Sequence, residues 1–191
     1  MNNSLIKYQS KKKVWHISGW NYAISNKNKI NNIETFFIRN MNCWGWGTWR
    51  DRWKKLNLNP VFFKKKFNKR DKYLFNLNNS FENFSQILRN DNKKISTWAI
   101  FWGATIFYHK GLCLNPLKSL TRNIGQDKSG TNSVNDYLFT KSLNTSKISI
   151  FPKQYIENHS IRNKIILFLS KNKNKSKIIN LFLDMYNRLF Y

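Results

Sequence analysis

Short apolar stretches separated by polar ones open the chain, and their spacing predicts both strands and helices. In "KVWHISGWNY" (13–22), apolar and polar residues alternate until Gly19, which is typical of a strand that leads into a loop. "ETFFIRNMN" (34–42) predicts a second short strand. Residues 1–10 carry their apolar side chains on one side, as the end of a helix does.

Tryptophan is concentrated in "CWGWGTWRDRWKKL" (43–56), where it is separated by glycines and followed by charged residues. Trp46, Trp49, Trp53 and Leu56 follow one another at spacings of three, four and three, which predicts a helix with a buried apolar stripe. Trp44 precedes this stripe, in a loop, and is the better candidate for a ligand contact. The alternative to a buried stripe is that the tryptophans of this segment form an aromatic platform that stacks against a sugar or a nucleobase.

The middle of the chain is predicted to be helical and then extended. Residues 61–92, after Pro60, indicate one or two helices that carry much of the lysine. "STWAIFWGATIFYHKG" (96–111) is apolar on most sides and predicts a buried helix, with Gly111 as the residue just past its end. An extended segment follows, and then the glycine-punctuated loop "RNIGQDKSGT" (122–131).

Beyond about residue 140 the pattern is looser. "KIINLFLDMYNRLFY" (177–191) predicts a terminal helix that either lies on an anionic membrane surface or packs against the domain. The longest apolar run, "IILFL" (165–169), is too short to cross a bilayer, and the N-terminus has no apolar signal segment. We therefore expect a cytoplasmic protein, with contact at most to the inner face of the membrane.

The charge suggests an anionic partner without naming one. The 191 residues, enough for one domain, include 34 basic and nine acidic side chains, for a net charge of +25. Such an excess attracts nucleic acid, anionic membranes or phosphorylated small molecules. The lysines are spread evenly, however, in a chain also rich in Asn, Ile and Phe, so part of the charge reflects overall composition.

Metal and disulfide chemistry find little support in the sequence. Cys43 and Cys113 have no CxxC spacing, so neither a zinc site nor a disulfide scaffold is expected, which favours a reducing compartment. His16, His109 and His159 have no second ligand at the spacing that zinc sites need. We assign none of them to a metal.

Three segments carry a resemblance to a known family. "VWHISGWNY", "CWGWGTWRDRW" and "STWAIFWGATIFYHKGLCLNPLKSLTRNIGQDKSGT" follow one another in an order and spacing similar to that of bacterial family 2 glycosyltransferases of the GT-A type. The resemblance covers about residues 1–132. It implies an α/β fold, a partial GT-A (Rossmann-like) domain with a few strands and surrounding helices. Residues 1–140 would form its acceptor-side portion, and we expect residues 141–191, which the resemblance does not cover, to form a basic helical extension.

The resemblance implies the transfer of a sugar from a nucleotide-sugar donor to a glycan or lipid-linked acceptor, in the biosynthesis of a surface polysaccharide such as lipopolysaccharide. The substrate-binding residues it implies in this chain are Trp44, Gly45, Trp46, Arg52, Trp98, Asn123, Gly125, Asp127, Ser129, Gly130 and Thr131. From the residues alone, Arg50-Asp51-Arg52 fits a diphosphate contact and a surface charge pair equally well.

The chain differs from the family at several features that the sugar-transfer reaction requires. The family's nucleotide-binding half and its acidic metal motif would precede Met1, so we expect a divalent metal (Mg or Mn) only for the full-length family, and a partner chain as one source of the missing half. The nine carboxylates here are isolated. The family's acidic residue before Trp98 is Ser96, which cannot act as a general base, and Asn132 replaces its histidine. No catalytic residue is assigned, and whether the chain is active alone stays open.

Two other functions compete with this one. A nucleic-acid-binding protein of ribosomal type would use Lys and Arg on phosphates and aromatic rings on bases. It predicts basic residues gathered on one face beside exposed aromatic rings, whereas here lysine is diffuse and tryptophan has core spacing. The third possibility is a non-enzymatic remnant that assembles with another transferase. A partial domain would also leave a sheet edge or face uncovered, which predicts marginal stability or association.

Overall fold

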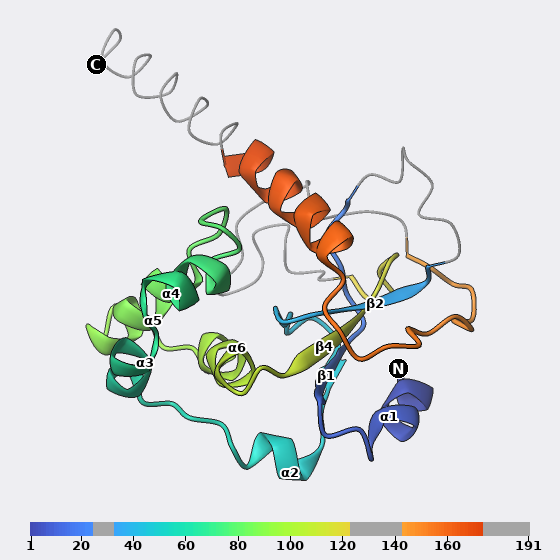
Figure 1. The fold of residues 1–191 in the computed structure, drawn as a ribbon, viewed down its shortest axis with the longest axis horizontal. Helices are drawn as coiled ribbons and strands as arrows, with labels where there is room; N and C mark the ends of the chain where they lie inside the picture. Colours follow the sequence, from blue (N-terminus) through green and yellow to red (C-terminus); the bar gives the residue numbers. More distant parts are fainter. Residues whose placement is uncertain (25–32, 123–142, 174–191) are drawn as a thin grey trace, which may run out of the picture.

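The computed structural model describes residues 1–24, 33–122 and 143–173, and these form a mixed α/β fold around a four-stranded sheet (Figure 1). In chain order its elements are α1 (Asn2–Tyr8), β1 (Val14–Ser18), β2 (Thr35–Ile38), β3 (Trp46–Gly47), α2 (Arg50–Trp53), α3 (Pro60–Lys66), α4 (Lys69–Phe75), α5 (Asn83–Asp91), α6 (Ala99–Tyr108), β4 (Leu112–Pro116) and a helix at residues 159–173. None of the described helices is both long enough and apolar enough to span a membrane.

The sheet is mixed, with strand order β2-β4-β1-β3. β1 and β4 are parallel neighbours, and β2 and β3 run antiparallel to them at the two edges. The two strands expected within 13–22 and 34–42 are confirmed, as is the extended segment after residue 111. Every residue of β1, β2 and β4 is buried, as in strands that are covered on both faces.

The faces of these three strands are covered, contrary to the expectation of an uncovered face, and the β2 edge of the sheet is covered in part. At the β2 edge, the Thr35 hydroxyl donates to the Ile150 carbonyl at 2.9 Å, and the Asn158 amide donates to the Phe37 carbonyl at 2.8 Å. The segment around residues 149–158 therefore satisfies part of the edge that sequence reasoning left open.

Helix α6 is the central helix, and the prediction of a buried apolar helix is confirmed. Eight of its ten residues are buried. Four of them pack into a phenylalanine-rich core with α3, α4 and α5, which lie together on one side of the sheet while α1 lies on the other (Figure 1). The predicted helical region 61–92 is confirmed, as three short helices rather than one or two. Asn59 and Asn68 cap the first two of these helices with their side chains.

The end of α6 falls one residue earlier than predicted. Lys110, with φ +55°, is the left-handed residue past the helix end, and the Gly111 amide donates to the Ile106 carbonyl at 2.8 Å. Gly111 is required for a different reason, because a Cβ there would lie 2.6 Å from Cγ of Trp15.

The predicted helix with a buried stripe at Trp46, Trp49, Trp53 and Leu56 is wrong. Only Arg50–Trp53 forms a helix, of a single turn, because Trp46 belongs to β3 and pairs with Ser18 of β1. The buried residue of that turn is Arg52, while Trp53 is exposed. Pairing with a strand 28 residues earlier in the chain overrides the local helical spacing.

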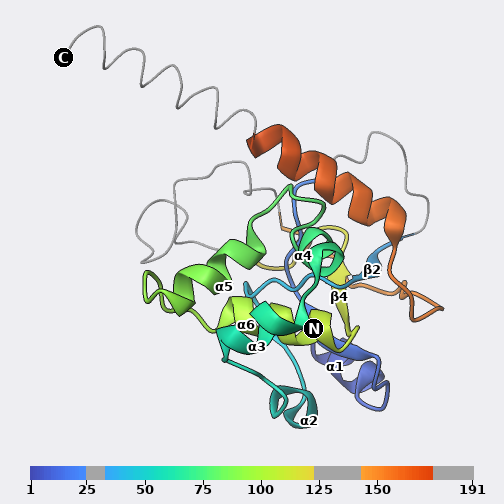
Figure 2. The ribbon, with the colours of Figure 1, turned by 60° about the vertical axis from the view of Figure 1, so that its left-hand side comes forward.

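Residues 159–173 form a helix, which lies within the stretch 141–191 that was expected to be a helical extension (Figure 2). Ile161, Ile165 and Leu169 pack with Phe36 and Ile38 of β2 in one core cluster. These residues, placed in an extension beyond residue 140, thus share the core of the earlier segments. The boundary at 140 and the predicted terminal helix at 177–191 lie outside the described residues.

Candidate functional site

Three tryptophans meet at the surface from three separate elements. Trp46 comes from β3, Trp53 from α2, and Trp98 immediately precedes α6. The ring centroids are 5.3 Å apart for Trp46 and Trp98, 5.5 Å for Trp46 and Trp53, and 5.8 Å for Trp53 and Trp98. Trp53 is 37% exposed and Trp98 41%. We call Trp46, Trp53 and Trp98 the tryptophan patch.

Buried rings support the patch from below. Trp102 of α6 is fully buried and lies edge-on to Trp53, with centroids 5.0 Å apart. His16 of β1 is also fully buried and stacks on Trp46, at 5.3 Å and an interplanar angle of 13°. The exposed rings are therefore held by a rigid layer rather than by solvent-exposed neighbours.

The hydrogen bonds of His16 define its tautomer. Its Nδ1 lies 3.3 Å from Nε1 of Trp102, and an indole N–H can only donate, so Nδ1 accepts. Its Nε2 therefore carries the proton and donates to the Asn42 carbonyl at 3.0 Å. Burial lowers the pKa of His16 to about 4, so the neutral ring is the native form at neutral pH.

The Trp44–Gly45 turn contacts Thr121, the residue immediately before the glycine loop. The Thr121 hydroxyl donates to the Trp44 carbonyl at 2.9 Å, and the Gly19 amide donates to the Gly45 carbonyl at 2.7 Å. Gly45 has φ +67°, and a Cβ there would lie 2.5 Å from Cγ2 of Thr121, so the close approach requires glycine. Two segments that the resemblance links are thus adjacent at this point.

The remaining loop residues predicted to bind substrate lie outside the described residues. They are Asn123, Gly125, Asp127, Ser129, Gly130 and Thr131. Of the described candidates, Trp46 and Trp98 belong to the patch. Trp44 instead packs edge-on against Trp20, with centroids 4.6 Å apart. Trp53 and Trp98 are the two exposed rings of the patch, but the spacing of Trp53 assigned it to the core. The sequence signal that could have pointed to a role at the surface was its place in a run of four tryptophans.

Arg52 is held away from the patch, against α1. Its guanidinium donates to Asp51 at 2.8 Å and to the Gln9 carbonyl at 2.8 Å, and it lies over the Trp49 ring at 4.5 Å. With 3% of its surface exposed, Arg52 links α1 to α2. Trp49 adds to this link by donating from Nε1 to the Leu5 carbonyl at 3.1 Å.

The described residues do not assemble a group of side chains that could hold a metal ion. In residues 1–24, 33–122 and 143–173, no three His, Cys, Asp or Glu side chains are grouped to hold a metal ion. Ser96, at the position where the family has its acidic residue, is exposed two residues before Trp98. The metal expected for the full-length family therefore stays a prediction.

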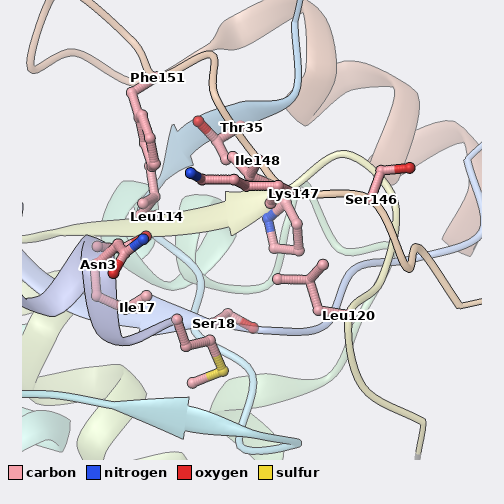
Figure 3. A pocket seen from close by; sticks show the side chains of 13 residues that line it. Asn3, Ile17, Ser18, Thr35, Leu114, Leu120, Ser146, Lys147, Ile148 and Phe151 are labelled. Atoms are coloured by element: carbon pink, nitrogen blue, oxygen red, sulfur yellow. The ribbon is translucent and has the colours of Figure 1, made fainter.

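A separate hollow of about 210 Å³ lies at the carboxyl ends of the parallel strands β1 and β4 (Figure 3). Ser18 and Pro116 end those strands there, and Asn3 of α1 and Thr35 of β2 complete the wall. Lys147 extends into the hollow in Figure 3. The carboxyl edge of parallel strands is where ligands bind in open α/β sheets.

Comparison with known proteins identifies neither a family nor a relative. No family model, no curated protein and no solved structure matches the chain. The assignment of function therefore rests on the tryptophan patch and on the order of the sequence motifs around it.

Proposed function

We propose that this chain is the acceptor-side portion of a glycosyltransferase that transfers a sugar from a nucleotide-sugar donor to a glycan or lipid-linked acceptor in surface-polysaccharide biosynthesis. The observation that carries the proposal is the tryptophan patch. Large aromatic rings at a surface cost free energy in water, and an exposed apolar patch marks a binding site. Two indoles more than a third exposed, with a third ring in contact with both, are such a feature.

The geometry of the patch suits a carbohydrate. Pyranose rings present C–H groups on one face, and indole faces bury this apolar surface while the hydroxyl groups keep contact with water. The rings of Trp46, Trp53 and Trp98 are inclined to one another rather than coplanar, at 36° to 77°. They therefore offer several faces to a chain of sugars. Support from Trp102 and His16 means that little ordering is needed on binding.

One residue of the patch, Trp98, is also close in sequence to the position where the resemblance places the chemistry. Trp98 follows Ser96, which occupies the position of the family's acidic residue. Deprotonation of an acceptor hydroxyl needs a carboxylate within hydrogen-bond distance, which Ser96 does not supply. In this proposal, a partner chain supplies that base together with the nucleotide-sugar and metal sites, and the present chain holds the acceptor.

Binding of an oligosaccharide is the test, with the full chain and a defined probe such as chitotetraose or a galactose-containing tetrasaccharide. The variant Trp53→Ala/Trp98→Ala should weaken binding at least roughly tenfold, measured by calorimetry, because it removes both exposed ring faces. Tyr73→Ala/Tyr108→Ala is the matched control, since these rings are 44% and 39% exposed elsewhere on the molecule. Its affinity should stay within about twofold of the parent chain.

Exposed indoles also stack on nucleobases, so the same variants test the competing function. If the parent chain bound single-stranded poly(U) and none of the oligosaccharides, and the patch variant lost that binding, the protein would be a nucleic-acid-binding protein. Equal glycan binding by the patch and control variants would also overturn the proposal.

A further inference from the structure

A second feature of α2 lies beside Arg52, where this short helix faces α1. A hollow of about 500 Å³ is lined there by Gln9, Lys12, Trp49, Arg50, Asp51, Arg52 and Lys54, and we call it the basic hollow. Four of these side chains are basic and one is acidic, so the wall carries an excess of positive charge. The function proposed above makes no use of it.

Asp51 neutralises only part of this charge. Its carboxylate accepts hydrogen bonds from Lys12 at 2.9 Å and from Arg52 at 2.8 Å. Arg50 and Lys54 are both exposed, and neither side chain has a hydrogen-bond or ion-pair partner among the described residues. The hollow is thus bordered by two cations that lack a counter-ion in the described part of the chain.

Arg50 and Lys54 lie on the same side of one helical turn. They are four residues apart, and the Lys54 amide donates to the Arg50 carbonyl at 3.0 Å, which closes the turn. Side chains four residues apart on a helix are neighbours, so like charges at these positions repel each other unless an anion lies between them. A ligand with two adjacent negative groups would relieve this repulsion.

The wall of the hollow is fixed before any ligand binds. The buried Arg52 guanidinium is held by Asp51, by the Gln9 carbonyl and by the Trp49 ring. Hydrogen bonds from Lys12 and Arg52 lower the pKa of Asp51 to about 2, so its carboxylate stays charged at neutral pH and keeps both partners in place. Arg52 Nε is buried and has no partner among the described residues, so this N–H group in the wall of the hollow lacks a hydrogen-bond acceptor.

We propose that the basic hollow binds a diphosphate or a pair of neighbouring phosphate groups, with Arg50 and Lys54 as its direct contacts. A guanidinium donates two parallel hydrogen bonds to phosphate oxygens, and the lysine adds a point charge beside it. Phosphate of this kind comes from a soluble diphosphate or from a phosphate-rich membrane surface. The inference goes beyond glycan binding and does not depend on it.

Two probes distinguish these sources, both used with the full chain. Isothermal titration calorimetry measures binding of inorganic pyrophosphate. Co-sedimentation measures binding to vesicles of equal parts phosphatidylcholine and phosphatidylglycerol, against vesicles of phosphatidylcholine alone. Arg50→Ala/Lys54→Ala should weaken binding of the relevant probe roughly tenfold, because both direct contacts are lost.

The control must remove the same charge elsewhere. Lys66→Ala/Arg70→Ala takes one lysine and one arginine from exposed positions on α3 and α4, so both double variants carry the same net charge. Its affinity should stay within about twofold of the parent chain. If the alanine variant of the hollow failed to fold, Arg50→Gln/Lys54→Gln would remove the same charges while keeping longer side chains.

Each result decides the matter. Pyrophosphate binding that is lost only in the hollow variant supports a soluble diphosphate, and vesicle binding lost only there, without pyrophosphate binding, supports a membrane surface. Equal losses in the two double variants would show diffuse attraction and overturn the proposal, as would a parent chain that binds neither probe. Trp53→Ala/Trp98→Ala should keep full phosphate binding. The glycan proposal and the phosphate proposal can therefore fail independently of each other.

Discussion

At the scale of single residues, His16 is the side chain whose protonation would most affect the support of the tryptophan patch. It connects the Asn42 carbonyl, the Trp102 indole and the Trp46 ring, and all three contacts use the neutral imidazole. Protonation at Nδ1 would place two donors opposite each other, because Trp102 Nε1 can only donate. The ring can therefore become charged only by breaking a contact that supports the patch.

This gives a dependence of stability on pH. The pKa of His16 falls from its ordinary value of 6.5 to about 4 on folding, so between these values the unfolded chain binds more protons than the native one. The free energy of unfolding should be highest above pH 6.5 and fall by about 2–3 kcal/mol as the pH is lowered to 4. Urea denaturation at a series of pH values measures it.

His16→Gln should flatten this decline between pH 7 and pH 5, whatever it does to stability at neutral pH. His159→Gln is the control, since it replaces a histidine that is exposed. His109, whose pKa is also lowered by burial and by Lys55, contributes a decline of the same sign. An unchanged slope in His16→Gln would show that His16 is not buried as the neutral ring.

At the scale of elements, the end of α6 shows two neighbouring residues with opposite requirements. Lys110 adopts a left-handed conformation that favours glycine, whereas Gly111 is needed for the space that Trp15 occupies. Sequence reasoning located the helix and its end to within one residue, because an apolar helix followed by glycine is a strong local signal. It could not separate the two roles, since the contact with Trp15 joins positions far apart in the chain.

The two substitutions should therefore act in opposite directions. Lys110→Gly should raise the free energy of unfolding by about 1 kcal/mol, because it removes the strain of a left-handed non-glycine residue. Gly111→Ala should lower it by about 1–3 kcal/mol, because the new methyl group meets Trp15. Thermal or chemical unfolding of the two variants beside the parent chain provides the comparison. Destabilisation by Lys110→Gly would contradict the assigned helix end.

At the scale of the whole molecule, residues 143–173 complete the core. The helix at 159–173 packs with β2, and Arg162 donates to the Leu74 carbonyl and to Asn78 in the turn after α4. The spacing of Ile161, Ile165 and Leu169 indicates a helix, but its short apolar runs are interrupted by lysine and asparagine. Which side of the helix is buried becomes clear only from its contact with β2.

A pair of substitutions in this helix tests its place in the fold. Ile165 is fully buried, so Ile165→Ala should lower the free energy of unfolding by about 2–4 kcal/mol. Leu167, two residues away, is 60% exposed, and Leu167→Ala should change it by less than about 0.5 kcal/mol. Denaturant titration of both variants provides the measurement, and equal effects would mean that this helix is an appended tail.

The amino-acid sequence by itself determined the elements whose signals are local. Strands β1, β2 and β4 and the apolar helix α6 follow from patterns within about ten residues, because alternation and all-round hydrophobicity each favour one backbone conformation. The order of the motifs also suggested a sugar transferase and its acceptor-side residues, which stays a proposal.

Tertiary structure decided which tryptophans are exposed and which charge is buried. Trp46 is extended because β1 pairs with it, and Arg52 is buried because Gln9, just after α1, accepts its hydrogen bond and Trp49 stacks on it. The pairing of Trp46 with Ser18 and the hydrogen bond from Arg52 to Gln9 join residues 28 and 43 positions apart, and their free energy exceeds the small local preference that predicted a helix. The patch and the basic hollow exist only because such distant segments meet.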